Sequence, residues 1–260
     1  TIAIGAATRA LEFLDESQKT YIMTIRLGEE TDTCDREGTV LSQTDPSFLE
    51  MDHIDKTLRR YRGRITQIPP HFSAIKHSGV PLYKLARKGI FPDLPERSVE
   101  IFSLELLSWH VPLLSLSMVC SKGTYARSVA RDLGRDLGVG GRLQSLRRVR
   151  SGPFHIEQAL PMDEIVSRGK EAVKDHIIPL VDVLTHIPTL HVTQDEVERL
   201  VHGNGVVLEP QEEQACWMGE DCLNHLLKAV SPNGDFLIFV EVEAKQSVVR
   251  LKPRKVLDLR

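Results

Sequence analysis

The segment Ser117–Arg150 constrains the fold of this chain more than any other, because it joins a buried strand to an amphipathic helix through a glycine turn. Apolar and polar residues alternate from Leu114 to Cys120, which predicts a half-buried strand. The turn Ser121–Thr124 follows, and Thr124 is the expected N-cap of a helix. Apolar residues then recur every four positions and predict one buried stripe. That stripe consists of Tyr125, Val129, Leu133 and Leu137.

The same segment is strongly basic. Between Ser121 and Arg150 there are eight basic residues and two acidic ones, Asp132 and Asp136. A glycine turn followed by an arginine-bearing helix start is a place where an anionic substrate could be held. The alternative is a solvated arginine face on which the two aspartates pair locally, and for the segment in isolation we favour this alternative.

The whole chain is nearly neutral, but its charge is segregated. Its 260 residues predict one large or two ordinary domains, and 41% hydrophobic with 27% charged residues is typical of a globular protein. The net charge of −3 alone argues against nucleic-acid binding. However, Lys56–Arg97 holds ten basic and two acidic residues, whereas Glu29–Asp55 and Glu209–Glu243 are acidic. This segregation predicts one positive face.

Several classes of site find no support in the sequence. Cys216, Cys222 and His225 lie close together but lack the paired spacing of a zinc site, so we expect no metal. No phosphate-binding glycine motif and no nucleophile elbow occur, so no nucleotide cofactor is expected. Irregularly spaced cysteines, no signal peptide and no apolar run of membrane-spanning length predict a cytoplasmic protein without a membrane partner.

The two carboxylates of Asp32 and Asp35 are a further candidate. They could form an acid/base pair, but an acidic turn with capping side chains is the interpretation that we favour.

The rest of the chain divides into a larger α+β part and a smaller β-rich part. Ser47 is expected to cap a helix with apolar positions at Phe48, Met51, Leu58 and Tyr61. Two prolines at Pro69 and Pro70 predict irregular structure in Gly63–Lys76. The other expected elements are the strands Lys19–Leu27, Val99–Leu107, Leu113–Cys120, Phe236–Val242, Val248–Leu251 and Lys255–Leu259, and the helices Ala7–Leu14, Val80–Gly89, Met162–Lys170 and Thr193–His202.

Five short motifs follow one another between Ile4 and Arg148. They are Ile4-Gly5-x-Ala7-Thr8-Arg9, then Lys19-x-Tyr21 leading to Arg26-Leu27-Gly28 and Thr31-Asp32-Thr33-x-Asp35, then Gln67-Ile68-Pro69-Pro70 with Phe72-Ser73-Ala74-x-Lys76, then Cys120-Ser121-Lys122-Gly123-Thr124-Tyr125-x-Arg127, and Leu146-Arg147-Arg148. In content, order and spacing they resemble the bacterial tRNA pseudouridine-55 synthases, the TruB family.

The resemblance implies a fold and a domain plan. The expected class is α+β, a pseudouridine synthase fold whose mixed, mostly antiparallel central sheet is flanked by helices. Residues 1–182 would form the catalytic domain, with a thumb-like RNA-binding insertion at about 64–97, which we call the thumb. Residues 187–260 would form a small PUA-like RNA-binding β-domain, a weaker resemblance than that of the first 150 residues.

The resemblance also implies an activity. The expected reaction is the isomerisation of uridine 55 in the T-loop of tRNA: the N-glycosidic bond breaks, the uracil turns, and a C5–C1′ bond forms without a cofactor. The enzyme must flip the base out of its stack, and a T-arm hairpin loop is a suitable substrate because its bases can be splayed. A monomeric protein is expected.

Residues that match the family's motifs are assigned roles by the resemblance. Tyr21 would stack on the flipped uracil with its hydroxyl taking part in proton transfer from C5, Arg127 would hold the catalytic aspartate ionised, and Leu146 would pack against the base. The expected RNA contacts are Lys76, Lys84, Arg87, Lys88, Lys122, Tyr125, Arg147 and Arg148, and for Lys122, Arg147 and Arg148 a structural pairing is the open alternative.

One family motif is not found in the sequence. The family's nucleophilic aspartate lies in Gly-x-Leu-Asp-Pro-x-Ala-x-Gly, just before the position of Ile2, and no such run occurs among the 260 residues. Because Thr1 begins in the middle of a pattern, we expect that an N-terminal segment carries it and that this chain alone is inert. Two alternatives stay open: a non-catalytic RNA-binding or RNA-folding protein of the same fold, and a guide-RNA-dependent relative.

Overall fold

The computed structural model describes residues 1–208, 226–245 and 248–260. The chain forms two compact units: one is Glu16–Ala159, and the other combines Thr1–Asp15 with Leu160–Arg260. The predicted domain boundary lies between residues 182 and 187, so residues 1–15 and 160–182 group differently in the compact units. As a boundary between functional domains, that position stays a prediction.

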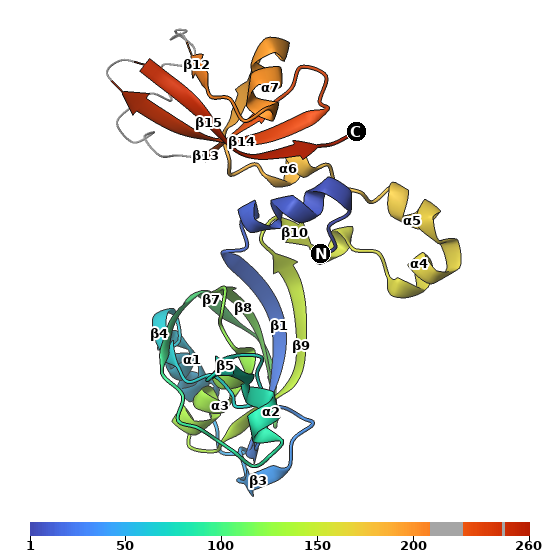
Figure 1. Ribbon diagram of the computed structural model, residues 1–260. Coiled ribbons are helices and arrows are strands. Elements are labelled where there is room, and N and C mark those ends of the chain that lie inside the picture. The colour runs from blue at the N-terminus through green and yellow to red at the C-terminus, as the bar shows by residue number, and fades with distance from the viewer. Residues whose placement is uncertain (209–225, 246–247) are drawn as a thin grey trace. The chain divides into compact units, whose positions relative to one another are not determined.

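The unit Glu16–Ala159 is built on one antiparallel sheet. Its strands are β1 (Gln18–Leu27), β4 (Gly63–Gln67), β7 (Arg97–His110), β8 (Leu113–Ser121), β9 (Gly141–Ser151) and β10 (Phe154–His155). They are ordered β10-β9-β1-β8-β7-β4, and Figure 1 shows β1 and β9 as two long strands side by side. The predicted α+β class with a mostly antiparallel sheet is confirmed.

Alternation decides which face of this sheet is buried. The apolar positions predicted on β8, including Leu116 and Met118, are fully buried. Met23 and Ile25 of β1 join the same core, and Tyr21 packs against it. In an antiparallel ladder the residues directly opposite each other share a face, so the core positions of neighbouring strands reinforce one another. The predicted strands at Lys19–Leu27 and Leu113–Cys120 are confirmed.

Two helices supply the other half of this core. They are α1 (Met51–Arg59), which contributes Ile54 and Leu58, and α3 (Ala126–Asp136). The prediction that Ser47 caps α1 was wrong, and so were the buried positions expected at Phe48 and Met51, which are exposed. The backbone N–H and the hydroxyl of Ser47 donate instead to the carboxylate of Asp45, so the chain turns before it enters the helix.

Helix α3 begins one residue later than predicted. Its N-cap is Tyr125 rather than Thr124, because the backbone N–H of Tyr125 donates to the side-chain oxygen of Gln67 at 3.1 Å. The buried stripe of α3 is confirmed, with Val129 and Leu133 fully buried. Gly134 lies against the backbone of Gly140 and Gly141, where any side chain would collide, so α3 packs directly on the start of β9.

Smaller elements surround the sheet. The predicted helix in Val80–Gly89 is present but shorter, and Gly63–Lys76 contains strand structure that the sequence analysis missed. Strand β9 was missed altogether, because its row of arginines hides the alternation. The remaining elements of this unit are β2 (Glu29–Thr31), β3 (Val40–Gln43), β5 (Lys76–His77), β6 (Val80–Pro81), α2 (Leu82–Ala86) and the 3₁₀ turn η2 (Ile156–Gln158).

The second unit holds a separate sheet and core. Its elements are the 3₁₀ helix η1 (Gly5–Phe13), α4 (Met162–Arg168), α5 (Lys170–Lys174), α6 (Leu180–Val183), β11 (Thr189–His191), α7 (Gln194–Val201), β12 (Val206–Leu208), β13 (Leu226–Val230), β14 (Phe236–Lys245) and β15 (Val248–Asp258). The strands are ordered β11-β13-β14-β15-β12. The ring of Phe13 stacks on Phe239 with centroids 3.8 Å apart, which ties η1 to this sheet.

The helix expected at Thr193–His202 is confirmed: Thr193 and Glu196 form a capping box at the start of α7. The two strands predicted at Val248–Leu251 and Lys255–Leu259 are the single strand β15, which continues through Pro253 with an irregular register. The PUA-like character of this unit stays a prediction.

Among the residues that the structure describes, no helix is long and apolar enough to cross a bilayer. The same residues contain no group of three or more histidine, cysteine, aspartate or glutamate side chains that could hold a metal ion. The candidate zinc ligands Cys216, Cys222 and His225 lie outside the described residues.

Candidate active site

Tyr21 lies on β1, on the face of the sheet that carries the core. Its direct neighbours across the sheet are Met118 of β8 and Arg148 of β9. The side chain is half-buried and packs against the core cluster. Burial raises the pKa of the Tyr21 hydroxyl, Cys120 adds to the rise, and the guanidinium of Arg148 opposes it. The phenol is therefore protonated near neutral pH and has a cationic neighbour on one side.

Leu146 lies on the same face as Tyr21. It stands opposite Met23, which is fully buried, yet 46% of the surface of Leu146 is exposed. An exposed leucine beside a half-buried tyrosine gives an apolar surface against which a flat ring can pack. The structure therefore brings these two predicted site residues together from strands far apart in the sequence.

An irregular register decides which arginine joins them. The pairing of β1 with β9 shifts at Gln144, between the buried core residue Leu143 and the predicted site residues. Strict alternation from Leu143 would place Arg147 on the face of Tyr21. The extra residue reverses the phase, so Arg148 stands opposite Tyr21 and Arg147 faces the other side of the sheet.

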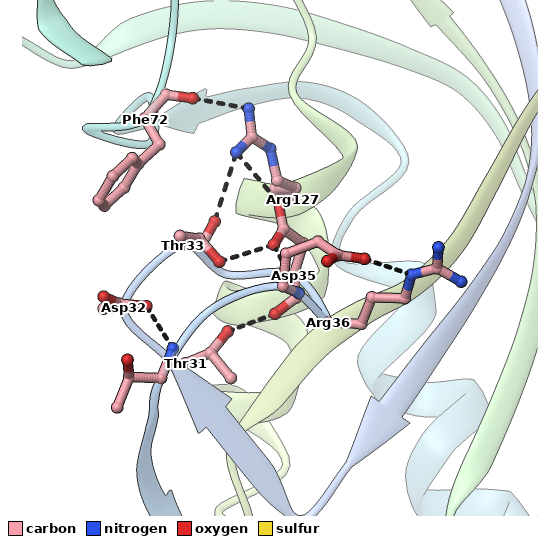
Figure 2. Close-up of polar contacts among 9 residues, drawn as sticks. Thr31, Asp32, Thr33, Asp35, Arg36, Phe72 and Arg127 are labelled. Atoms are coloured by element: carbon pink, nitrogen blue, oxygen red, sulfur yellow. Dashed lines mark hydrogen bonds and ion pairs between the residues drawn. The ribbon is translucent and has the colours of Figure 1, made fainter. Parts of the chain in front are cut away.

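Arg127 lies in the first turn of α3, and its guanidinium links this helix to the loop that holds Thr33 and Asp35 and to Phe72 (Figure 2). Its Nη1 lies 3.2 Å from a carboxylate oxygen of Asp35 and 3.5 Å from the backbone carbonyl of Thr33. Its Nη2 donates to the backbone carbonyl of Phe72 at 2.8 Å. Both members of the Arg127–Asp35 ion pair are 25% exposed, so the pair is partly shielded from water and its geometry is held from several sides.

The loop from Thr31 to Thr39 presents Asp35 to Arg127. The other carboxylate oxygen of Asp35 accepts from the hydroxyl of Thr33 at 2.6 Å and from the backbone N–H of Glu37 at 3.1 Å. Asp32 accepts from the backbone N–H of Thr39 at 2.8 Å (Figure 2). The favoured interpretation of the two aspartates as capping side chains is confirmed, and Asp35 has the additional task of orienting Arg127.

The other arginines of α3 are engaged in ion pairs. Arg131 pairs with Asp132 at 2.7 Å, and Arg135 pairs with Glu30 at 2.8 Å. The expectation that Asp136 pairs locally is wrong. Its carboxylate accepts from Arg60 and Tyr61, in the segment that follows α1. The helix face is therefore neither free for an anion nor merely solvated.

The same turn of α3 fixes the start of the thumb. The side-chain amide of Gln67 exchanges two hydrogen bonds with the backbone of Tyr125. The carbonyl of Ile68 accepts from Ser128 at 2.8 Å and from Arg131 at 3.0 Å. Together with the Arg127 contact to Phe72, these bonds attach the entry to the thumb, residues 67–72, to the helix that carries the site arginine.

Comparison with known proteins decides the family. Residues 1–126 match the family described as TruB family pseudouridylate synthase (N terminal domain), and residues 127–185 match the tRNA pseudouridylate synthase B C-terminal domain. A tRNA pseudouridine synthase B from Dehalococcoides mccartyi is 36% identical over 235 residues, which are 90% of this chain and 78% of that protein. The chain belongs to the TruB family.

Other TruB relatives and solved structures agree with this assignment. The tRNA pseudouridine synthase B of Francisella philomiragia is 41% identical over 200 residues, which cover 76% of this chain and 66% of that protein. A chain in a Cbf5-Nop10-Gar1 complex has a TM-score of 0.64 at 19% identity, covering 98% of this chain and 70% of its own length. At that identity the likeness establishes the fold, which confirms the predicted pseudouridine synthase architecture.

The cations predicted to contact RNA in this TruB chain share two properties. Lys76, Lys84, Arg87 and Lys88 of the thumb are exposed, as is Lys122 in the turn before α3. Within the described residues none of them forms an ion pair with a carboxylate; Arg87 lies over the ring of Tyr83 at 5.6 Å. Exposed, unpaired cations keep their charge available for an anion, although their role as RNA contacts stays a prediction.

The sequence did not reveal two of the residues that hold the candidate site together. Gln67 and Phe72 belong to one of the family motifs, but the motif assigns them no role. In the structure both residues attach the start of the thumb, residues 67–72, to α3. The signal was their position beside Pro69 and Pro70 in a basic region. Nothing in the sequence could have shown that a backbone carbonyl of this segment would meet Arg127.

Proposed function

We propose that this chain is a tRNA pseudouridine synthase that acts on uridine 55 of the T-loop. Membership of the TruB family carries the proposal. Two further observations support it: Tyr21 and Leu146 lie on one face of the sheet, and Arg127 belongs to the same compact unit. The reaction is an isomerisation: the N1–C1′ bond breaks, the uracil turns, C5 bonds to C1′, and the proton leaves C5 while N1 gains one.

Tyr21 and Leu146 suit the binding of a flipped uracil. Both stand on one face of the sheet, one half-buried and one exposed, so a base can stack on the phenol ring and contact the leucine. Base–aromatic stacking is worth about 1–3 kcal/mol, which offsets part of the few kcal/mol that unstacking costs.

Arg127 suits the orientation of a nucleophilic carboxylate. Its two terminal nitrogens contact Asp35, Thr33 and Phe72, and its Nε makes no hydrogen bond with the described residues. A guanidinium has five N–H groups, so a second carboxylate can be accommodated beside the ribose. We propose that this second carboxylate is the family's catalytic aspartate, whose motif does not occur among the 260 residues.

The thumb and the turn before α3 suit binding of the T-arm backbone. Their cations, which have no carboxylate partner among the described residues, provide the sequence-independent electrostatic attraction, while the base is selected at Tyr21 and Leu146. The β-rich C-terminal part, residues 187–260, is proposed to be a PUA-like RNA-binding domain. The protein is proposed to act in the cytoplasm as a monomer and without a cofactor.

Tritium release from C5-labelled uridine in a T-arm transcript tests this function. This chain is compared with a version extended N-terminally by the Gly-x-Leu-Asp-Pro-x-Ala-x-Gly motif. Release by the extended version alone is expected. Release by neither version, with tight RNA binding retained, would refute the proposal in favour of a non-catalytic RNA-binding protein.

A further inference from the structure

Arg148 is the cationic side chain that stands directly opposite Tyr21. In the ladder of β1 and β9 the paired residues are Tyr21 with Arg148, Ile22 with Arg147 and Met23 with Leu146. Directly opposed residues have Cβ atoms about 4.5–5.5 Å apart and project from the same face. A guanidinium on this face can therefore reach the ring and the hydroxyl of Tyr21, whereas that of Arg147 leaves the sheet on the other side.

The register that produces this pairing is irregular on both sides. Shifts at Gln144 and at Val149 flank a regular stretch, Ser145–Arg148 against Tyr21–Thr24. Bulges of this kind are found next to active sites, where they re-aim side chains. Here the shift at Gln144 exchanges the faces of two consecutive arginines, so the fold selects Arg148 for the Tyr21 side.

Arg148 also differs from Arg142, another arginine of the same strand. The guanidinium of Arg142 is buried and bound to Glu29 and Gln144, so it serves the packing of β9. Arg148 is exposed and forms no ion pair with a carboxylate among the described residues. Its charge is therefore available to the tyrosine.

The electrostatics of Tyr21 agree with this geometry. Burial raises the pKa of its hydroxyl, and Cys120 of β8 raises it further. The guanidinium of Arg148 opposes both effects and lowers the pKa of this hydroxyl. These are the groups that act on Tyr21 from the two strands on either side of it.

We propose that Arg148 is a positioning residue for Tyr21: it holds the ring in place and orients its hydroxyl, while Arg147 has no part in this. The proposal rests on the proposed function, because the orientation of Tyr21 matters only when uracil stacks on it. Arg148 thereby leaves the group of phosphate contacts and acts through the tyrosine.

The direct test uses this chain and needs no catalysis. A fluorinated tyrosine, whose phenol titrates at lower pH than tyrosine, is incorporated at position 21 and its titration is followed by ¹⁹F NMR. Arg148→Ala is expected to raise the pKa of this phenol and change its chemical shift, with Arg148→Lys in between. Arg147→Ala is the matched control and should leave both unchanged. Equal effects of the two alanine variants, or no effect of either, overturn the proposal.

The second test measures turnover in the N-terminally extended version. Arg148→Ala should lower single-turnover tritium release about tenfold or more and change the Kd for a T-arm hairpin by less than about threefold. In a Tyr21→Phe background, Arg148→Ala should lower the rate of tritium release much less, because the hydroxyl that Arg148 orients is gone. An equally large loss of rate in that background, or weaker RNA binding without a loss of rate, contradicts the positioning role.

The two tests separate the proposals. If the extended version releases no tritium while the ¹⁹F titration responds to Arg148 and not to Arg147, the synthase function fails and the Tyr21–Arg148 pairing stands. If the extended version releases tritium but Arg148→Ala leaves the ¹⁹F titration unchanged, the function stands and the positioning role fails.

Discussion

The basic residues of the helices and those of the thumb carry the same charge but have different partners. On α1, Lys56 pairs with Asp52 and Arg59 with Asp55. On α3, each of Arg127, Arg131 and Arg135 has a carboxylate partner within 4.0 Å. The thumb cations have none among the described residues.

The number of basic residues in a segment therefore does not indicate how many of them remain without a carboxylate partner in the folded chain. Counted along the sequence, Lys56–Arg97 and Ser121–Arg150 are both strongly positive. In the folded chain, the arginines of α1 and α3 pair with carboxylates, either of the same helix (Arg59 with Asp55, Arg131 with Asp132) or of the segment that holds Glu30 and Asp35. Among the described residues, positive charge stays without a carboxylate partner at the thumb and at Arg147 and Arg148 of β9, whereas Arg142 of the same strand pairs with Glu29.

The largest effect is expected from Arg127, the one paired arginine that we place in the site. In the extended version, Arg127→Ala should lower the rate of tritium release by about 10²- to 10³-fold, because the catalytic carboxylate loses its orienting partner, and should change RNA affinity little. Arg135→Ala is the matched control, since it removes an exposed arginine of the same helix that pairs with Glu30. Equal losses of rate and affinity would move Arg127 to the binding surface.

A smaller loss of rate is expected from Asp35. Asp35→Asn keeps the shape of the side chain but weakens the ion pair with Arg127, so the rate should fall about 10- to 100-fold. Asp32→Asn, which alters a loop carboxylate that caps the N–H of Thr39, should leave the rate within about twofold. Single-turnover kinetics of both variants check this, and identical rates for the two would show that Asp35 does not serve Arg127.

The thumb cations should govern affinity and its dependence on salt. Lys84→Ala combined with Lys88→Ala should weaken binding of a T-arm hairpin. The log–log salt slope should become less steep by about 0.7 for each single-stranded phosphate that the variant no longer neutralises. Lys56→Ala with Arg59→Ala removes the same charge from α1, where both residues are already paired, and should change the slope little. Fluorescence titrations over a range of salt concentrations distinguish the two double variants. The same slope for both would show that the thumb cations bind RNA no more than the paired cations of α1 do.

The smallest effect concerns the hydrogen bond that joins the segment after α1 to α3. The hydroxyl of Tyr61, a buried residue, donates to Asp136 at 3.1 Å, so Tyr61→Phe should lower the free energy of unfolding by about 1 kcal/mol at neutral pH. Burial and Asp136 raise the pKa of Tyr61, so this stabilisation is present below about pH 10 and is lost as pH rises further. Urea unfolding from pH 8 to 11 should show wild type falling more steeply than Tyr61→Phe, with Tyr83→Phe as control. Parallel pH profiles would contradict this.

The strands of regular alternation, the apolar stripe of α3 and the family could all be predicted from the sequence. Tyr21, Met118 and Val129 fall where period-2 and period-3.6 patterns place them, because burying one apolar face is the dominant local constraint. The motifs around Tyr21, Arg127 and Leu146 were sufficient to predict the synthase family.

The tertiary structure decided which of the charged and polar residues meet. Whether Arg147 or Arg148 faces Tyr21 depends on one extra residue at Gln144. The alternation of apolar and polar residues in the sequence does not reveal this one-residue shift of register. Whether Arg127 meets Asp35 and the carbonyl of Phe72 depends on loops brought together from three distant segments. Hydrophobic periodicity places elements, but hydrogen bonds and ion pairs between elements depend on register and packing, which no single segment encodes.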